Sequence, residues 1–199
     1  VEAAGIPSMI KALLAARLDG LPPEERSVLQ LAAVFGKVFW ASGLRALGVI
    51  ADTTEHLDAL EHKDFLRSKS RSQIRGDQEY TFKHELIRDV AYEMLPRAQR
   101  RSLHGKVVDW MEQAVGERVE EYFDLLAHHA SQAGQQQRAI AYLIRAAERA
   151  HRTAARQQEA ALLGEAIGLA ERLGQEDLVA ALHAQRGKAF ADLGMWAAA

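Results

Sequence analysis

The chain of 199 residues contains no cysteine, only four prolines and no long apolar run. Without cysteine it cannot form a disulfide scaffold, an iron–sulfur cluster or a zinc–thiolate site. No apolar stretch approaches the roughly 18 residues of a membrane span, and the first residues lack the basic-then-apolar pattern of a signal peptide. These absences predict a cytoplasmic protein with no membrane partner.

An excess of charge of one sign is also missing, because 25 basic residues nearly balance 27 acidic ones and leave a net charge of −2. What is abundant is alanine, with 36 residues, and hydrophobic residues make up 48% of the chain. Alanine favours helices that pack closely. The composition therefore predicts a mainly α globular protein of one or two domains. The first residue is not Met and the last three alanines continue a helical pattern, so we expect a part of a longer protein.

Helices and then a hairpin are expected in the first half of the chain. The apolar spacing and the breaks at glycine and proline predict helices over residues 6–18, 23–36, 41–47 and 52–64. Two segments with strand character, 65–70 and 79–83, flank a polar turn at Gly76-Asp77. Three helices followed by a two-stranded hairpin are typical of a winged helix-turn-helix domain. We assign this domain to residues 22–96, with residues 1–21 as a linker helix.

The second half of the chain has no strand signal. An amphipathic bridging helix is expected within 97–118. Beyond it, four helices are predicted over residues 122–133, 139–150, 155–173 and 178–193. Paired helices that stack through small residues indicate an α-solenoid. The residues around the turns resemble a tetratricopeptide repeat, although their spacing departs from its 34-residue period. We therefore predict tetratricopeptide-like repeats over 119–199.

Catalytic and metal-binding patterns are missing. Each Gly-Lys pair lacks the glycine five residues earlier that a phosphate-binding P-loop requires. His84 is followed four residues later by Arg88, so the second ligand of a zinc-protease helix is absent. His128 and His129 are adjacent on a helix and point about 100° apart, which prevents joint chelation. The sequence therefore predicts no catalytic residue, no metal site and no cofactor in this chain, which is not expected to be an enzyme.

The expected hairpin is basic, and the helix before it is acidic. Segment 65–76 carries a charge of +4 from four basic residues, which are Arg67, Lys69, Arg71 and Arg75. Segment 52–64 carries a charge of −4, because Lys63 is opposed by five acids, which are Asp52, Glu55, Asp58, Glu61 and Asp64. The basic residues could follow a phosphate backbone or contact a protein. A groove-reading helix of that charge would be repelled by DNA, which argues against nucleic acid as the partner.

Several stretches together carry a resemblance to one family. They are Ile6-Pro7-Ser8, ARLDGLP at 16–22, VLQLAAVFG at 28–36, YTFKHELIRDVAY at 80–92 and LAHH at 126–129. In this combination the chain resembles the region after the ATPase core in bacterial STAND regulators, which are AAA/NACHT-like signalling ATPases. These are often fused to class III adenylyl or guanylyl cyclase domains or to LuxR-type DNA-binding domains. The resemblance implies a winged helix and tetratricopeptide-like repeats, with ATP or ADP bound by an upstream ATPase domain of the parent protein.

The block that begins at His84 also resembles the MHD motif that closes the winged helix of NB-ARC switches. There the histidine approaches the β-phosphate of ADP, so the resemblance implies that His84 senses the nucleotide. The sequence departs from that motif at Lys83, where the motif has Met, and at Glu85, where it has Asp. The alternative interpretation is that the histidine caps the helix beginning there.

The sequence therefore predicts a non-enzymatic regulatory fragment of a signalling ATPase. Its winged helix would relay the nucleotide state, and its repeats would bind a protein partner or mediate assembly. The competing interpretation is a DNA-binding transcriptional regulator whose winged helix is followed by a helical effector domain. A freestanding tetratricopeptide adaptor is a third interpretation.

Overall fold

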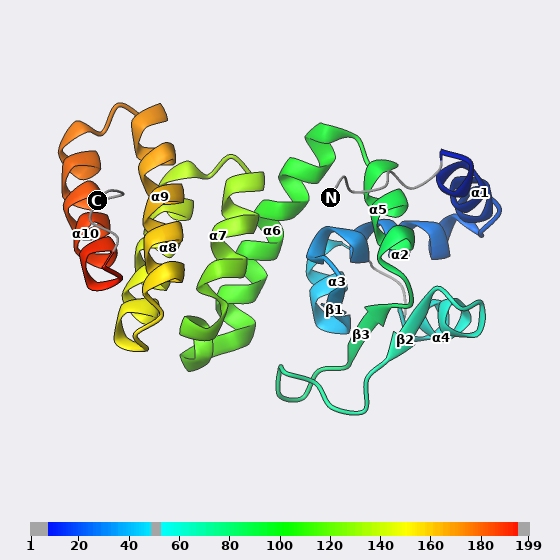
Figure 1. Cartoon of the computed structure of the whole chain (residues 1–199). Helices are drawn as coiled ribbons and strands as arrows, with labels where there is room; N and C mark the ends of the chain where they lie inside the picture. The colour runs from blue at the N-terminus through cyan, green and yellow to red at the C-terminus, as the bar shows by residue number, and fades with distance from the viewer. Residues whose placement is uncertain (1–7, 49–52, 195–199) are drawn as a thin grey trace. The chain divides into compact units, whose positions relative to one another are not determined.

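The computed structural model describes residues 8–48 and 53–194, and the chain divides into a first unit, Val1–Ala114, and a second unit, Val115–Ala199 (Figure 1). The protein is mainly helical, as the composition predicts. No helix in these described ranges is long and apolar enough to cross a membrane. Asp52, Ile6 and Pro7 lie outside the described residues, as does the segment 195–199.

The first unit contains six helices and three strands among its described residues. In chain order they are α1 (Ser8–Asp19), α2 (Pro23–Phe35), β1 (Val38–Trp40), α3 (Ala41–Leu47), α4 (Thr53–His62), β2 (Leu66–Ser68), β3 (Glu79–Phe82), α5 (Glu85–Glu93) and α6 (Arg97–Val115). A proline at its first position and two acids in its first turn begin α2 where the sequence predicts, because both suit the positive end of a helix.

The three strands form one antiparallel sheet with the order β1-β3-β2. The pairing of β2 with β3 is the expected hairpin, in which Arg67 lies opposite Thr81. Strand β1, which pairs Phe39 with Tyr80, was not expected. It has only three residues between the end of α2 and the start of α3, too few for an alternating pattern to indicate a strand.

The core of the first unit joins the sheet to α6 through aromatic rings. Phe39 is fully buried and stacks on Tyr80 at 5.6 Å between ring centroids. Trp110 of α6 meets Phe35 edge-on at 5.4 Å and lies 5.7 Å from Trp40. Gly43 makes this packing possible, since a Cβ there would lie 2.7 Å from the Phe35 ring. The expected bridging helix is thus α6 over most of its length, and it packs on the first unit.

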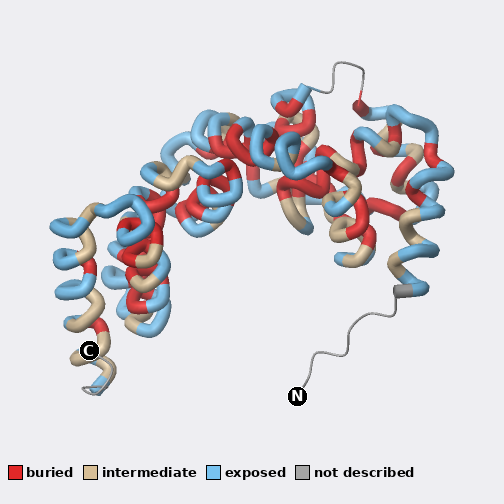
Figure 2. The backbone as a smooth tube through the Cα atoms, turned by 90° about the horizontal axis from the view of Figure 1, so that it is seen from above, coloured by how far each residue is buried: buried red, intermediate tan, exposed pale blue. Residues whose placement is uncertain are grey.

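The second unit is an array of helices joined by short turns. Its elements are the 3-10 helix η1 (Gly116–Tyr122), α7 (Phe123–Gln132), α8 (Gln136–Arg152), α9 (Arg156–Arg172) and α10 (Glu176–Asp192). Each of the last three packs against the helix before it. Buried backbone runs along α8 and α9 in Figure 2, whereas α10 is drawn mostly as exposed.

The turns of this array repeat every 20 residues. A left-handed residue stands in each turn, with φ angles of 73°, 58°, 66° and 71° at Gly134, Ala154, Gly174 and Gly194. In the first three turns, the next amide donates to the carbonyl oxygen five residues earlier, as from Gln135 to Ala130 at 2.8 Å. Such bonds close a helix end with the glycine-type cap. Two helices with their turns therefore span 40 residues, which explains why the spacing departs from the 34-residue period of a tetratricopeptide repeat.

Ala154 stands where the equivalent turns have glycine, and its Cβ makes the left-handed conformation costly. Ala154→Gly should therefore raise the free energy of unfolding of the second unit by about 0.5–1 kcal/mol. The matched control Gly174→Ala should lower it by about 1 kcal/mol, since no neighbouring atom compensates for the strain. Thermal unfolding followed by circular dichroism measures both, and a destabilised Ala154→Gly protein would contradict the prediction.

Candidate functional site

His84 stands at the junction between the sheet and α5. Its backbone is extended, with φ −136° and ψ 138°, and its carbonyl oxygen accepts the amide of Ile87 at 3.1 Å. The side chain is exposed and makes no capping hydrogen bond. The interpretation of His84 as a side-chain cap is therefore wrong, because the imidazole makes no hydrogen bond to the amides of the first turn. The ring is left on the surface.

The charged neighbours of His84 are already paired. Lys83 forms an ion pair with Asp64, and its ammonium group lowers the pKa of that carboxyl group. Glu85 forms an ion pair of 3.1 Å with Lys37. Within the described ranges, no group of three His, Cys, Asp or Glu side chains could hold a metal ion. The exposed imidazole is thus a hydrogen-bonding group without a competing ion pair from its sequence neighbours.

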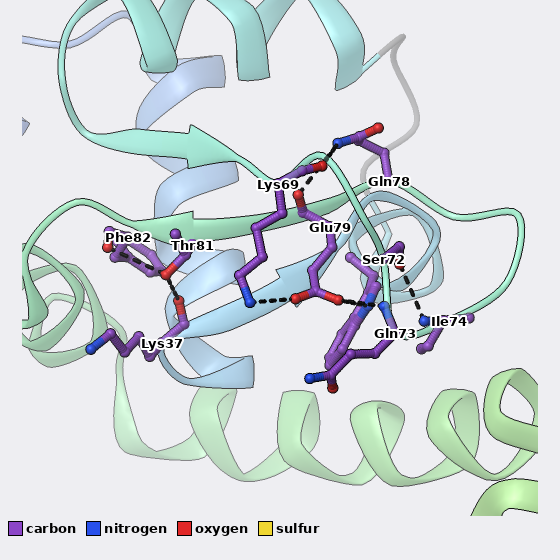
Figure 3. Close-up of polar contacts among 10 residues, drawn as sticks. Lys37, Lys69, Ser72, Gln73, Ile74, Gln78, Glu79, Thr81 and Phe82 are labelled. Atoms are coloured by element: carbon purple, nitrogen blue, oxygen red, sulfur yellow. Dashed lines mark hydrogen bonds and ion pairs between the residues drawn. The ribbon is translucent and has the colours of Figure 1, made fainter.

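The segment between β2 and β3 is held by one buried carboxylate (Figure 3). Glu79 is fully buried, and its Oε1 lies 2.6 Å from Nζ of Lys69. Its Oε2 accepts the backbone amide of Gln73 at 2.7 Å and the indole N–H of Trp40 at 3.2 Å. A buried carboxylate is tolerated only when its oxygens are satisfied in this way. Glu79 therefore fixes the loop, β3 and β1 together.

The four basic residues of the hairpin do not act as one cationic patch. Lys69 directs its charge inward to Glu79, and its carbonyl oxygen accepts the side-chain amide of Gln78 at 3.0 Å. Arg67, Arg71 and Arg75 are exposed. The charge of +4 counted along segment 65–76 therefore includes one charge, that of Lys69, which is already paired with Glu79. This pairing was missed because the sequence gives no sign that Glu79 is buried.

Helix α4 presents an acidic surface. Its following residue Lys63, the cation of this segment, binds both carboxylate oxygens of the buried Glu25 at 2.6 and 2.7 Å. Glu55 and Asp58 stay exposed. The pKa of Tyr80 is raised by burial and, to a smaller degree, by the charges of Asp58, Glu61 and Asp77. The exposed carboxylates of α4 therefore keep its surface acidic, while just beyond the helix Lys63 is paired with Glu25 and Asp64 with Lys83.

The second unit carries a groove of about 700 Å³ between α7 and α9. Small and apolar residues line part of it, among them Ala127, Ala161 and Gly168. Glu165 and Arg172 add charged groups to its lining. His128 lines the groove, whereas His129 is buried, and the two rings meet edge-on with their centroids 5.3 Å apart. No local sequence pattern indicates this groove, because α7 and α9 are separated in the chain by the whole of α8.

Comparison with known proteins gives one weak relative. No protein-family model matches the chain, and no solved structure matches it. The chain is 28% identical over 181 residues to an uncharacterized protein of Rhizobium meliloti (strain 1021). That alignment covers 88% of this chain but 17% of the relative. The chain thus spans less than a fifth of the length of the relative it matches.

Removing the Glu79 carboxylate should destabilise the first unit. Glu79→Ala leaves the Trp40 indole and the Gln73 amide without an acceptor, so the free energy of unfolding should fall by about 2–4 kcal/mol. Urea unfolding in a Trp196→Phe background measures this through the fluorescence of Trp40 and Trp110. The control Glu55→Ala, on the exposed face of α4, should change stability by less than about 0.5 kcal/mol. Equal effects of the two variants would contradict the anchoring role.

Proposed function

We propose that this chain is the regulatory and protein-interaction part of a STAND signalling ATPase. Residues 22–96 act as a winged helix that relays the nucleotide state of an upstream ATPase domain in the same protein. The helical repeats over 119–199 bind a protein partner or mediate assembly. The parent protein binds ATP or ADP in the cytoplasm and carries a further effector, such as a nucleotide cyclase or a DNA-binding domain. This chain contributes no catalytic residue of its own.

The order of elements in the first unit carries the proposal. Helix, strand, two helices and two strands follow one another from α2 to β3, and the three strands form one antiparallel sheet. This order suits a winged helix, in which the segment between β2 and β3 is the wing. His84 lies two residues after the end of β3 and exposes its side chain. The stretch 80–92, which carries the strongest resemblance to STAND regulators, thus contains an exposed histidine that another domain could reach.

A nucleotide-sensing role also fits the chemistry of His84. A neutral imidazole donates one N–H, and a protonated one donates two, so the ring can bond a phosphate oxygen held by the ATPase domain. Lys83 and Glu85 are paired with Asp64 and Lys37 and so do not draw the imidazole into an ion pair. Loss of one such bond can release a packed domain.

The helical repeats supply the protein-binding surface that this proposal requires. The groove between α7 and α9 combines a partly apolar lining with polar groups, as in sites that bind a peptide or a helix. Its position along successive helices suits a solenoid, whose repeats present one continuous surface. The chemistry of this groove therefore supports protein binding better than catalysis.

DNA binding by the winged helix is the alternative function, and a salt titration separates the two. We expect the 199-residue chain to bind duplex DNA no tighter than about 10⁻⁵ M at physiological salt, because α4 is acidic and Lys69 is neutralised. Fluorescence anisotropy across salt concentrations measures the dissociation constant and its salt slope. Specific binding near about 10⁻⁸ M, with a steep slope that falls by about one in Arg71→Ala, would favour the regulator instead.

The sensing role of His84 is tested in the full-length parent protein. His84→Ala should accelerate ADP release by about 10-fold or more, because a hydrogen bond to a charged group contributes about 1.5–3 kcal/mol. Release of a fluorescent ADP analogue measures the rate. The control His183→Ala removes an exposed histidine of α10 and should leave release unchanged. Unchanged ADP release and unchanged basal signalling in His84→Ala would remove His84 from the mechanism.

A further inference from the structure

Basic residues alternate with serines in segment 67–72. The segment reads Arg-Ser-Lys-Ser-Arg-Ser, and no acid stands between residues 65 and 76. Protein kinases that prefer basic substrates select a serine by the cations near it, above all by the one three residues before it. The three serines share a basic surrounding, and the fold decides which of them a kinase could use.

Ser68 is already engaged by a neighbouring carboxylate. Its hydroxyl donates to Oε1 of Glu61 at 2.9 Å, and its backbone amide donates to the same oxygen at 2.7 Å. The residue three positions before it is Phe65, which is buried and carries no charge. Ser68 thus lacks both an available hydroxyl and the cation that would select it.

Ser72 is excluded by its own contacts and by the buried carboxylate of Glu79. Its hydroxyl oxygen accepts the amide of Ile74 at 3.2 Å, and the residue is half-buried. The cation three positions before it is Lys69, whose ammonium group lies 2.6 Å from Oε1 of Glu79 (Figure 3). Recruiting Lys69 to a kinase would leave a buried carboxylate unpaired, which is costly.

Ser70 differs from both. It is exposed, and its hydroxyl has no hydrogen-bond partner in the described part of the chain. Arg67, three positions before it, and Arg71, directly after it, are exposed as well. Arg67 lies on β2, an edge strand of the sheet, so the residues that lead to Ser70 are already extended. Beyond β2 the chain forms neither helix nor strand until β3 (Figure 1), and such an exposed segment suits a kinase cleft.

We propose that Ser70 is a phosphorylation site for a protein kinase that prefers basic substrates, with ATP as the phosphoryl donor. Oγ of Ser70 forms a bond to the γ-phosphorus of ATP, and the bond from that phosphorus to the oxygen bridging it to the β-phosphate breaks. ADP leaves, and the hydroxyl proton passes to the catalytic aspartate of the kinase. The kinase is a separate protein, so this chain supplies the acceptor hydroxyl and the cations that present it.

The phosphate would change the charge of the segment between β2 and β3. Three exposed arginines, Arg67, Arg71 and Arg75, give this segment its free positive charge. A phosphoserine carries about −1.5 to −2 at pH 7 and would offset more than half of that charge. Phosphorylation therefore weakens any contact of the segment with an acidic partner. This inference does not depend on the proposed function of the chain.

Treatment of the whole chain with the catalytic subunit of cyclic-AMP-dependent protein kinase, a kinase of this preference, tests the site. With ATP we expect phosphate on Ser70, located by mass spectrometry, and its loss in Ser70→Ala. Arg67→Ala should lower kcat/KM by about 10-fold or more, because it removes the cation that the kinase cleft binds. The control Arg97→Ala removes an exposed arginine of α6 and should leave kcat/KM unchanged.

Ser102 provides an internal control for the role of conformation. It follows Arg100 and Arg101 and is exposed, but it lies within α6. A helical serine does not fit a cleft that binds extended substrates, so Ser102 should stay unmodified. Phosphate found mainly on Ser68, Ser72 or Ser102, or no phosphate at all, would overturn the proposal.

A free peptide of residues 64–76 separates the basic pattern from its setting in the fold. Because the fold already exposes Ser70, the whole chain should be phosphorylated with a kcat/KM within about 30-fold of that of the peptide. A larger deficit of the whole chain would show that the site opens only by local unfolding, and this result would also overturn the proposal.

Discussion

The first unit depends on the burial of a single carboxylate. An ionised group removed from water is stable only when its oxygens find donors, and for Glu79 these come from Trp40 of β1 and from Lys69 and Gln73 of the loop after β2. Satisfying Glu79 therefore determines where β1 and the loop lie relative to β3. His84 follows five residues later, two residues beyond the end of the same strand, so the anchor also helps to determine where the His84 side chain emerges.

Trp40 connects this polar anchor to the aromatic core. Its indole N–H donates to Glu79 while its ring lies beside Trp110 of α6. Trp110 in turn meets Phe35 and donates its own N–H to the hydroxyl of Ser42 at 3.2 Å. The loop, the sheet and α6 therefore share one continuous network, in which a polar change is transmitted to the packing of aromatic rings.

The elements that could be predicted from the sequence are those marked by local signals, such as helix-breaking residues or a clear hydrophobic period. Pro23 and Gly36 mark α2, and the alternation around Glu79–Phe82 marks β3, because breakers and period act over a few residues. Strand β1 exists only through its pairing with β3, and the pairing of Lys69 with Glu79 depends on a burial that no local pattern reveals. Formal charge counted along the hairpin thus placed Lys69 among the surface cations. The groove between α7 and α9 needs two helices that are distant in sequence. The names winged helix and tetratricopeptide repeat stay predictions, since other folds share short sheets and helical arrays.

The regular turns of the second unit have a consequence for how the array can change. Three turns share one backbone geometry, and α8, α9 and α10 have the same length of 17 residues. The turns therefore keep successive helices in the same phase. A duplication or deletion of 40 residues would preserve this phase, whereas a single inserted residue within a helix would rotate all later side chains by about 100°. The array can thus change length in steps of one helix pair, so the length of its surface is a discrete quantity.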